Sequence, residues 1–173
     1  MSTARSEEAR LLFSFIRPED AKAWAAINDG VMGGVSEGEM RPTDQGSALF
    51  AGEISLANNG GFSSVHSRTG AYDLSGFGGI ALRCRGYGRR YKFSVRVDPG
   101  LDRVMYQAGF DPVSDEWSEH FLPFDSFIPT HHGRRVDSAG PLDPGRILAM
   151  GLLIADGQAG PFRLEIEWIK ARR

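Results

Sequence analysis

The amino-acid sequence predicts an all-β fold, a β-sandwich with one short helix near the N-terminus. Apolar and polar residues alternate with a period of two in several short runs, a pattern that is typical of strands with one buried face. The 22 glycines and 9 prolines interrupt the chain at short intervals, as turns between many short strands require. Residues 147–154 are almost entirely apolar, and this short run indicates a strand that is buried on both faces.

Length and composition are those of one globular domain. The chain has 173 residues, of which 41% are hydrophobic and 24% charged, so it can bury a core of its own. A net charge of -2 indicates no preference for nucleic acid or for a membrane surface, and no apolar run approaches the roughly 20 residues of a membrane span. We expect a flexible tail at residues 1–10, a single domain at 11–173, and a cytoplasmic protein, because the polar N-terminus does not resemble a targeting segment.

The N-terminal part of the chain is expected to contain the helix. Pro18, the two acidic residues after it and four alanines predict a helix at residues 18–27, because proline suits the first turn and acids suit the positive end of the helix dipole. Strands with weaker patterns are expected at residues 11–16, 36–41, 47–54, 62–68, 103–110 and 116–122. Together these strands leave little room for further helices.

The most regular alternation, at residues 80–85 and 91–97, predicts an antiparallel hairpin. Gly86 and Gly88 between the two runs tolerate the positive φ angles that a tight turn needs. The polar positions of both runs would share one face and form a basic stripe of Arg83, Arg85, Lys92 and Arg96. Such a stripe could bind an acidic partner.

The C-terminal run, residues 162–168, predicts a strand with one wet face. Its apolar positions end at Trp168, and its polar positions include Glu165 and Glu167. If this strand lies beside the hairpin, the two glutamates could neutralise the basic stripe through weak exposed ion pairs. An ordinary solvated surface therefore stays open as the alternative to a binding stripe.

No pattern in the sequence predicts catalysis. Cys84 falls on the apolar side of its strand, where burial would raise the pKa of the thiol and make it inert. His131 and His132 adjoin Arg134 and Arg135, whose charges would repel a metal ion. Neither a Gly-x-Ser-x-Gly elbow nor a phosphate-binding Gly-x-x-x-x-Gly-Lys-Ser/Thr loop is present. We expect a protein that is not an enzyme and has no obligatory cofactor.

Two loops rich in Asn, Asp and Gly are candidate binding sites. Asn28 and Asp29 begin the first loop, and Asn58 and Asn59 begin the second. Loops at the ends of a sandwich can present such side chains to a ligand, but the same side chains commonly bond their own backbone in turns. A structural calcium ion between Asp29 and Glu167 also stays open.

Aromatic residues offer a further surface, this time for a sugar. A stacking platform on a sheet could be formed by Tyr72, Tyr87, Tyr106 and Trp117. Tyr106 alternates with apolar positions and is expected inside the protein instead. Two or more exposed, coplanar rings would favour a glycan, whereas a basic or apolar patch would favour a protein partner.

Several motifs in a fixed order resemble one known family. They are Trp24 with NDGVMGGVSEG at residues 28–38, FAGEISL at 50–56, NNGGFSSV at 58–65, GYGRRYKF at 86–93, Phe127-Ile128-Pro129 with Gly133-Arg134, and GLLI at 151–154 followed by 158–162 and Trp168. Over residues 11–170 the chain resembles the complex I intermediate-associated protein 30 family. Two departures are visible, because His66 stands where arginine is expected and His131-His132 replaces an aromatic-arginine pair.

The resemblance implies a jelly-roll sandwich like the galactose-binding and carbohydrate-binding-module folds. From the mitochondrial relatives it also implies a non-catalytic role in the assembly of NADH:ubiquinone oxidoreductase, with protein partners such as complex I subunits. The alternative is a carbohydrate-binding module that recognises a glycan; nucleic acid is not expected in either case. The candidate contact residues are Asn28, Asp29, Asn58, Asn59, Arg83, Arg85, Arg96 and Arg134.

Overall fold

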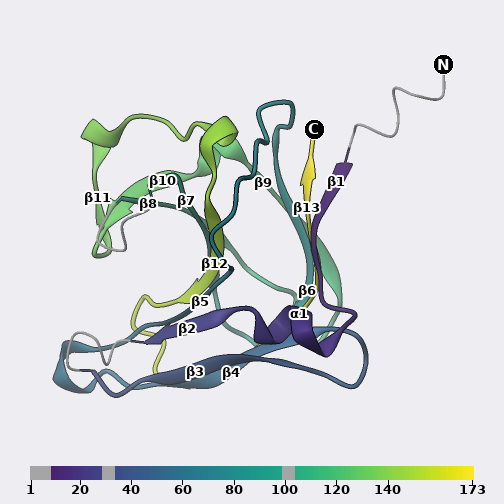
Figure 1. The fold of residues 1–173 in the computed structure, drawn as a ribbon. Helices are drawn as coiled ribbons and strands as arrows, with labels where there is room; N and C mark the ends of the chain where they lie inside the picture. Colours follow the sequence, from purple (N-terminus) through teal and green to yellow (C-terminus); the bar gives the residue numbers. More distant parts are fainter. Residues whose placement is uncertain (1–8, 29–33, 99–103) are drawn as a thin grey trace.

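The computed structural model describes residues 9–28, 34–98 and 104–173, which fold into two facing antiparallel sheets (Figure 1). One sheet has six strands, namely β1 (Ala9–Ser14), β3 (Glu37–Pro42), β4 (Ala48–Ile54), β6 (Gly79–Gly86), β9 (Ser118–Pro123) and β13 (Gly160–Arg172). Their order across the sheet is β3-β4-β13-β6-β9, and β1 also pairs with β13. The long strand β13 therefore lies at the centre of this sheet.

The other sheet has seven strands. They are β2 (Ala25–Asn28), β5 (Ser63–His66), β7 (Tyr91–Arg96), β8 (Met105–Phe110), β10 (Ile128–His131), β11 (Arg134–Arg135) and β12 (Ala149–Ile154), in the order β11-β10-β8-β7-β12-β5-β2. Short helices connect the strands: α1 (Pro18–Lys22) and the 3-10 turns η2 (Ala57–Asn59), η3 (Phe124–Ser126), η4 (Asp137–Ala139) and η5 (Pro144–Arg146). The predicted all-β sandwich is confirmed. In the part of the chain that the structure describes, no helix is long and apolar enough to cross a membrane.

The core lies between the sheets and is built from the inward positions of their strands. In β12, Met150, Leu152 and Ile154 are buried, as the apolar run at residues 147–154 predicts. The rings of Phe50 in β4 and Tyr91 in β7 meet edge to face across the interface, with their centroids 6.3 Å apart. Both sheets are thus held by one shared aromatic core.

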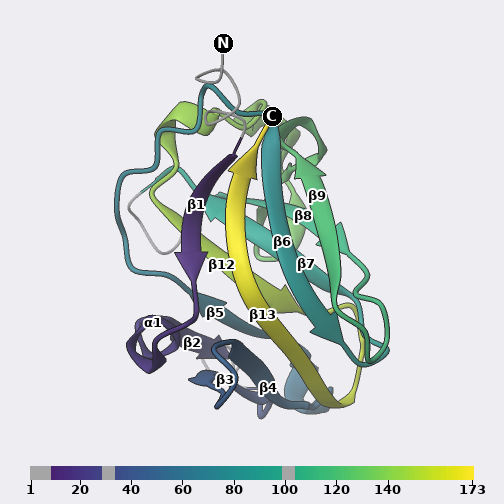
Figure 2. The same ribbon diagram turned by 90° about the vertical axis from the view of Figure 1, so that its right-hand side faces the viewer.

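The predicted hairpin at residues 80–85 and 91–97 is wrong. Strand β6 pairs with β13 and β9 in the six-stranded sheet, whereas β7 pairs with β12 and β8 in the seven-stranded sheet. The chain crosses from one sheet to the other after Gly86 (Figure 2). Alternation indicates only that one face of each strand is buried. A hairpin within one sheet and two strands in facing sheets both fit this pattern. The crossing divides the predicted basic stripe between two opposite surfaces.

The predicted helix at residues 18–27 is correct only in its first half. The α-helix ends at Lys22, and Ala25–Asn28 forms β2 at the edge of the seven-stranded sheet. Between them Trp24 is buried and its ring meets Phe13 and Phe15 edge to face, at 5.1 and 5.8 Å. Pairing with β5 and burial of Trp24 outweigh the helix propensity of the alanines, because tertiary contacts commonly override local propensity.

A β-bulge in β13 changes which side chains face outward. The register between β13 and β6 shifts between Ile166 and Trp168, and this places an extra residue on the bulged strand. Ile169 takes the next inward position and is fully buried. Trp168 is half-buried beside Arg83, so its predicted place in the core is wrong.

Candidate functional site

The side chain of Asn28 ties three strands together. The hydroxyl of Ser63 in β5 donates to Asn28 Oδ1 at 2.5 Å, and Asn28 Nδ2 donates to the carbonyl of Gly38 in β3 at 3.2 Å. A Cβ at Gly38 would collide with Ser63 Oγ, so the strands approach closely only because this residue is glycine. Both polar ends of the Asn28 amide are therefore used inside the protein, where they join the edges of the two sheets.

Replacing Asn28 with alanine should lower the free energy of unfolding by about 1 to 3 kcal/mol. The reason is that Ser63 is fully buried and its hydroxyl would lose its acceptor. Urea unfolding of Asn28→Ala measures the effect, with Ser75→Ala as the control because Ser75 makes an exposed hydrogen bond to Asp73. Equal midpoints for the two variants would contradict this structural role.

The other candidate residues of the two loops that the structure describes show no contact that indicates a ligand or a calcium site. Asn58 is exposed and has φ 56 and ψ 34, a left-handed conformation that asparagine tolerates well. Asn59 follows it in η2. Asp29 lies outside the described residues, and Glu167, the other proposed calcium ligand, lies 3.5 Å from Arg83 Nε. Within the described residues no group of three His, Cys, Asp or Glu side chains is placed to hold a metal ion.

The four candidate arginines fall on three separate surfaces. Arg83 and Arg85 lie on the outer face of the six-stranded sheet, and Arg96 lies on the outer face of the seven-stranded sheet. Arg134 is exposed on the short edge strand β11. Lys92, the fourth member of the predicted stripe, shares the face of Arg96 and forms an ion pair of 3.3 Å with Asp156. The basic stripe therefore does not exist as one surface.

The outer face of the six-stranded sheet instead gathers aromatic rings and cations from β6, from β13 and from the residues directly after β6 and directly before β9; these three strands lie side by side in Figure 2. We call this surface the aromatic–cationic face, formed by Tyr87, Trp117, Trp168, Arg83, Arg85, Arg163 and Lys170. Each of its rings has a cation above it. The guanidinium carbons of Arg85 and Arg83 lie 5.1 and 5.7 Å from the ring of Trp117.

The same arrangement repeats along β13. Arg163 lies 5.0 Å from the ring of Tyr87, and Lys170 Nζ lies 4.0 Å from the ring of Trp168. Distances below about 6 Å are those of attractive cation–π contacts. Of these residues the sequence reasoning named Arg83, Arg85, Tyr87 and Trp117, but it treated the arginines and the rings as separate surfaces.

Two glutamates hold the arginines in place. Glu165 is only 5% exposed, and its Oε1 accepts a hydrogen bond from Arg85 Nη2 at 2.8 Å. The hydroxyl of Tyr87 lies 3.5 Å from the same oxygen, and Glu167 pairs with Arg83 at 3.5 Å. The predicted wet position of Glu165 is wrong, because its side chain is buried beside Arg85 and Tyr87. These contacts order the face before any partner binds, which reduces the entropy lost on binding.

The geometry of this face suits a protein partner better than a glycan. A sugar needs an open ring face, and each of these half-buried rings already has a cation over it. The other proposed platform residues lie elsewhere, because Tyr106 is in the core, as predicted, and Tyr72 packs against Phe13. Tryptophan, tyrosine and arginine are the residues most enriched at the energetic centres of protein interfaces.

Exposed apolar side chains extend the face. Phe121 of β9 lies opposite Ala81 and is 44% exposed, and Leu11 of β1 lies opposite Lys170 and is 56% exposed. Both lie on the outer side of the sheet because Ala81 and Lys170 occupy outward positions. Rings, cations and apolar side chains together have the composition of a protein-binding surface.

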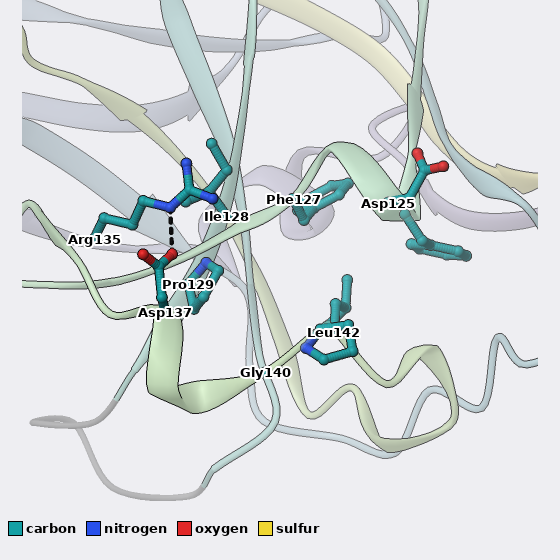
Figure 3. Close-up of a pocket in the computed structure, with 10 residues that line it drawn as sticks. Asp125, Phe127, Ile128, Pro129, Arg135, Asp137, Gly140 and Leu142 are labelled. Atoms are coloured by element: carbon teal, nitrogen blue, oxygen red, sulfur yellow. Dashed lines mark hydrogen bonds and ion pairs between the residues drawn. The ribbon is translucent and has the colours of Figure 1, made fainter.

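A hollow at one end of the sandwich is a weaker candidate (Figure 3). Its walls come from η3, β10 and the segment that follows β11, and they include Phe127, Ile128 and Leu142. The charged side chains Arg135 and Asp137 at its rim form an ion pair with each other. The carboxylate of Asp125 is the one lining charge without an ion pair among the described residues, and a single carboxylate beside apolar walls gives little selectivity for a ligand.

The thiol of Cys84 is shielded from solvent. It is fully buried in β6, and burial raises its pKa to about 12, as the sequence predicts in direction. A thiol with such a pKa is protonated and unreactive at neutral pH.

The sequence model of the complex I intermediate-associated protein 30 family matches residues 13–166 of the chain. The chain is 31% identical over 94% of its length to the mitochondrial complex I intermediate-associated protein 30 of Mus musculus, and 24% identical over 95% to that of Drosophila melanogaster. It spans 56% and 63% of these two relatives. The expected cytoplasmic location is contradicted, because these relatives are named as mitochondrial proteins.

Solved structures with the same architecture include carbohydrate-binding modules and parts of agarases. The family 11 module from Clostridium thermocellum, solved with a mixed-linked tetrasaccharide, has a TM-score of 0.71 at 17% identity, covering 95% of both chains. A family 29 module has a TM-score of 0.54 at 12% identity, covering 94% of this chain and 83% of the module. At such low identities the likeness confirms the jelly-roll fold and does not transfer a ligand.

Proposed function

The chain belongs to the complex I intermediate-associated protein 30 family, and from this membership we propose that it is a non-catalytic binding protein that helps to assemble complex I. The observation that carries the proposal is the family match over residues 13–166. No catalytic residue and no cofactor is part of this role. The chain spans little more than half of the mouse relative. The proposed role is therefore that of this one domain, which binds a partner protein, and not that of the whole relative.

The aromatic–cationic face is the proposed contact surface for a protein partner of complex I assembly. Arg83 and Arg85 are already paired with glutamates. Among the described residues, by contrast, neither Arg163 nor Lys170 forms an ion pair. Their charges are therefore available to carboxylates of a partner, while the adjacent rings and Phe121 offer apolar contact area. The partner segment that fits this face is acidic with apolar residues between its acids.

Deleting this chain from an organism that encodes it tests the proposal. Assembled complex I, measured on native gels and by NADH:ubiquinone oxidoreductase activity, should fall and should be restored by the wild-type chain. A Trp117→Ala/Arg163→Glu double variant should restore little, because losing a central aromatic residue and reversing a charge weaken binding by at least about 30-fold. Unchanged complex I after deletion would contradict the assembly role.

A matched variant separates loss of the face from loss of one surface charge. Lys22→Glu makes the same kind of charge reversal at an exposed position of α1 and should restore complex I fully. Circular dichroism should show both variants folded. If the double variant restores complex I as well as the wild type, the partner binds elsewhere. A glycan signal that depends on Trp117 would instead favour the carbohydrate-binding alternative.

A further inference from the structure

The outer face of the seven-stranded sheet carries a row of polar residues in direct register. His66 in β5 pairs with Gly151 in β12, Gly151 pairs with Ser94 in β7, and Ser94 pairs with Gln107 in β8. Arg96 lies two residues beyond Ser94 and so shares its face. We call these side chains the polar row: His66, Ser94, Gln107 and Arg96. It lies on the opposite side of the sandwich from the aromatic–cationic face.

Gly151 brings two members of the row together. A Cβ at this position would lie 2.6 Å from Ser94 Oγ and 2.7 Å from His66 Nδ1. Both polar atoms therefore lean over the glycine from the strands on either side, and any side chain here would push them apart. Their convergence makes a small polar centre in the middle of the sheet.

Hydrogen bonds determine which nitrogen of His66 carries its proton. The hydroxyl of Ser64 donates to the carbonyl of Ile27 at 2.8 Å and also lies 3.0 Å from His66 Nε2. Because the one hydroxyl proton is already used, Nε2 must be the donor in the second bond. Burial, with a smaller contribution from Arg96, lowers the pKa of His66 to about 4, so the ring is neutral at physiological pH. The lone pair of Nδ1 is then an acceptor above Gly151.

Arg96 has a charge that nothing in the described residues balances. Its Nε is buried without a hydrogen-bond partner, and none of the described ion pairs involves it. Lys92, on the same strand and face, is paired with Asp156. Partial burial of a guanidinium charge without a counter-charge is unfavourable. A bound anion would supply the missing counter-charge and accept the hydrogen bonds of the guanidinium.

We propose that the polar row binds a small anion that also carries hydroxyl groups, such as a sugar acid or a sugar phosphate. The carboxylate or phosphate accepts hydrogen bonds from the guanidinium of Arg96, which suits either group well. A hydroxyl of the ligand donates to His66 Nδ1, whereas Ser94 is only 1% exposed and lies behind the contact surface. Gln107 adds its amide, which in this structure donates only to the weak acceptor Met105 Sδ at 3.5 Å.

Isothermal titration calorimetry on the purified chain tests this site independently of complex I assembly. The probes are glucuronate and glucose 6-phosphate, which tell a carboxylate from a phosphate, with glucose as the neutral control. At least one anion should bind with a saturable signal, about tenfold or more tighter than glucose. No saturable anion binding up to about 10 mM, or equal binding of glucose, would overturn the proposal.

Substitutions locate the site. Arg96→Gln should weaken anion binding about tenfold or more without lowering the melting temperature, because it removes a cation that lacks a carboxylate partner. Lys92→Gln removes a charge from the same face and strand and should leave the affinity unchanged. Equal loss in both variants would indicate attraction to general positive charge and would overturn the proposal, as would unchanged affinity in Arg96→Gln.

Discussion

Replacing Arg85 with leucine is expected to lower the free energy of unfolding by about 3 kcal/mol. The substitution leaves the carboxylate of Glu165 buried, with only the hydroxyl of Tyr87 nearby at 3.5 Å. Removing one partner of a buried pair is costly because the remaining charge keeps its desolvation penalty and loses its counter-charge. Leucine also loses the cation–π contact with Trp117. Chemical unfolding at pH 7 measures the change.

Two further variants make the reason for this loss testable. Arg83→Leu should cost below about 1 kcal/mol, because Arg83 and Glu167 form a longer pair that is partly exposed. The double variant Arg85→Leu/Glu165→Leu should regain most of the lost stability, since it removes the buried charge together with its partner. A double variant as unstable as Arg85→Leu would show that packing, and not the unpaired carboxylate, causes the loss.

Acidification is expected to cost the protein about 3 kcal/mol through His66 alone. Burial lowers the pKa of this imidazole from 6.5 to about 4 in the folded protein. Between these values the unfolded chain binds the proton and the folded protein does not. The contribution of His66 to stability is thus complete above pH 6.5 and is lost as the pH falls through about 4.

Unfolding measured from pH 7 to pH 4 in the wild type and in His66→Gln isolates this contribution. The carboxylates and the other histidines are common to both proteins, so the difference between the two curves reports His66. We expect the wild type to lose more stability than the variant across this range. Parallel curves would mean that the imidazole is solvated in the folded protein and can take up its proton there.

Local sequence patterns were sufficient for much of the fold. The alternation in residues 80–85 and 162–166 reports burial on one face, and Leu82, Cys84 and Leu164 are buried as it predicts. This works because side chains of a strand point alternately to its two faces, whatever its neighbours are. The same pattern contains no information about which strand lies alongside, and the predicted hairpin failed for that reason.

The candidate site depended more on tertiary structure. Arg83 and Arg85 were recognisable as outward-facing cations, but the ring of Trp117 beneath them is brought by the segment before β9, and their glutamates by β13. Trp168 reaches the outer face only through the bulge in β13. The prediction from alternation assumes a regular strand. A bulge adds one residue and so reverses the facing of the residues after it.

The sequence by itself determined that this protein is all-β, that its strands have buried and exposed faces, and that it resembles the complex I intermediate-associated protein 30 family. Only the tertiary structure decided that Arg85 and Arg96 lie on opposite sides of the sandwich and that Asn28 is used inside the protein. The physical reason is that burial of a face is a local property of each strand. Pairing between strands far apart in the chain is instead settled by the shared core and by register.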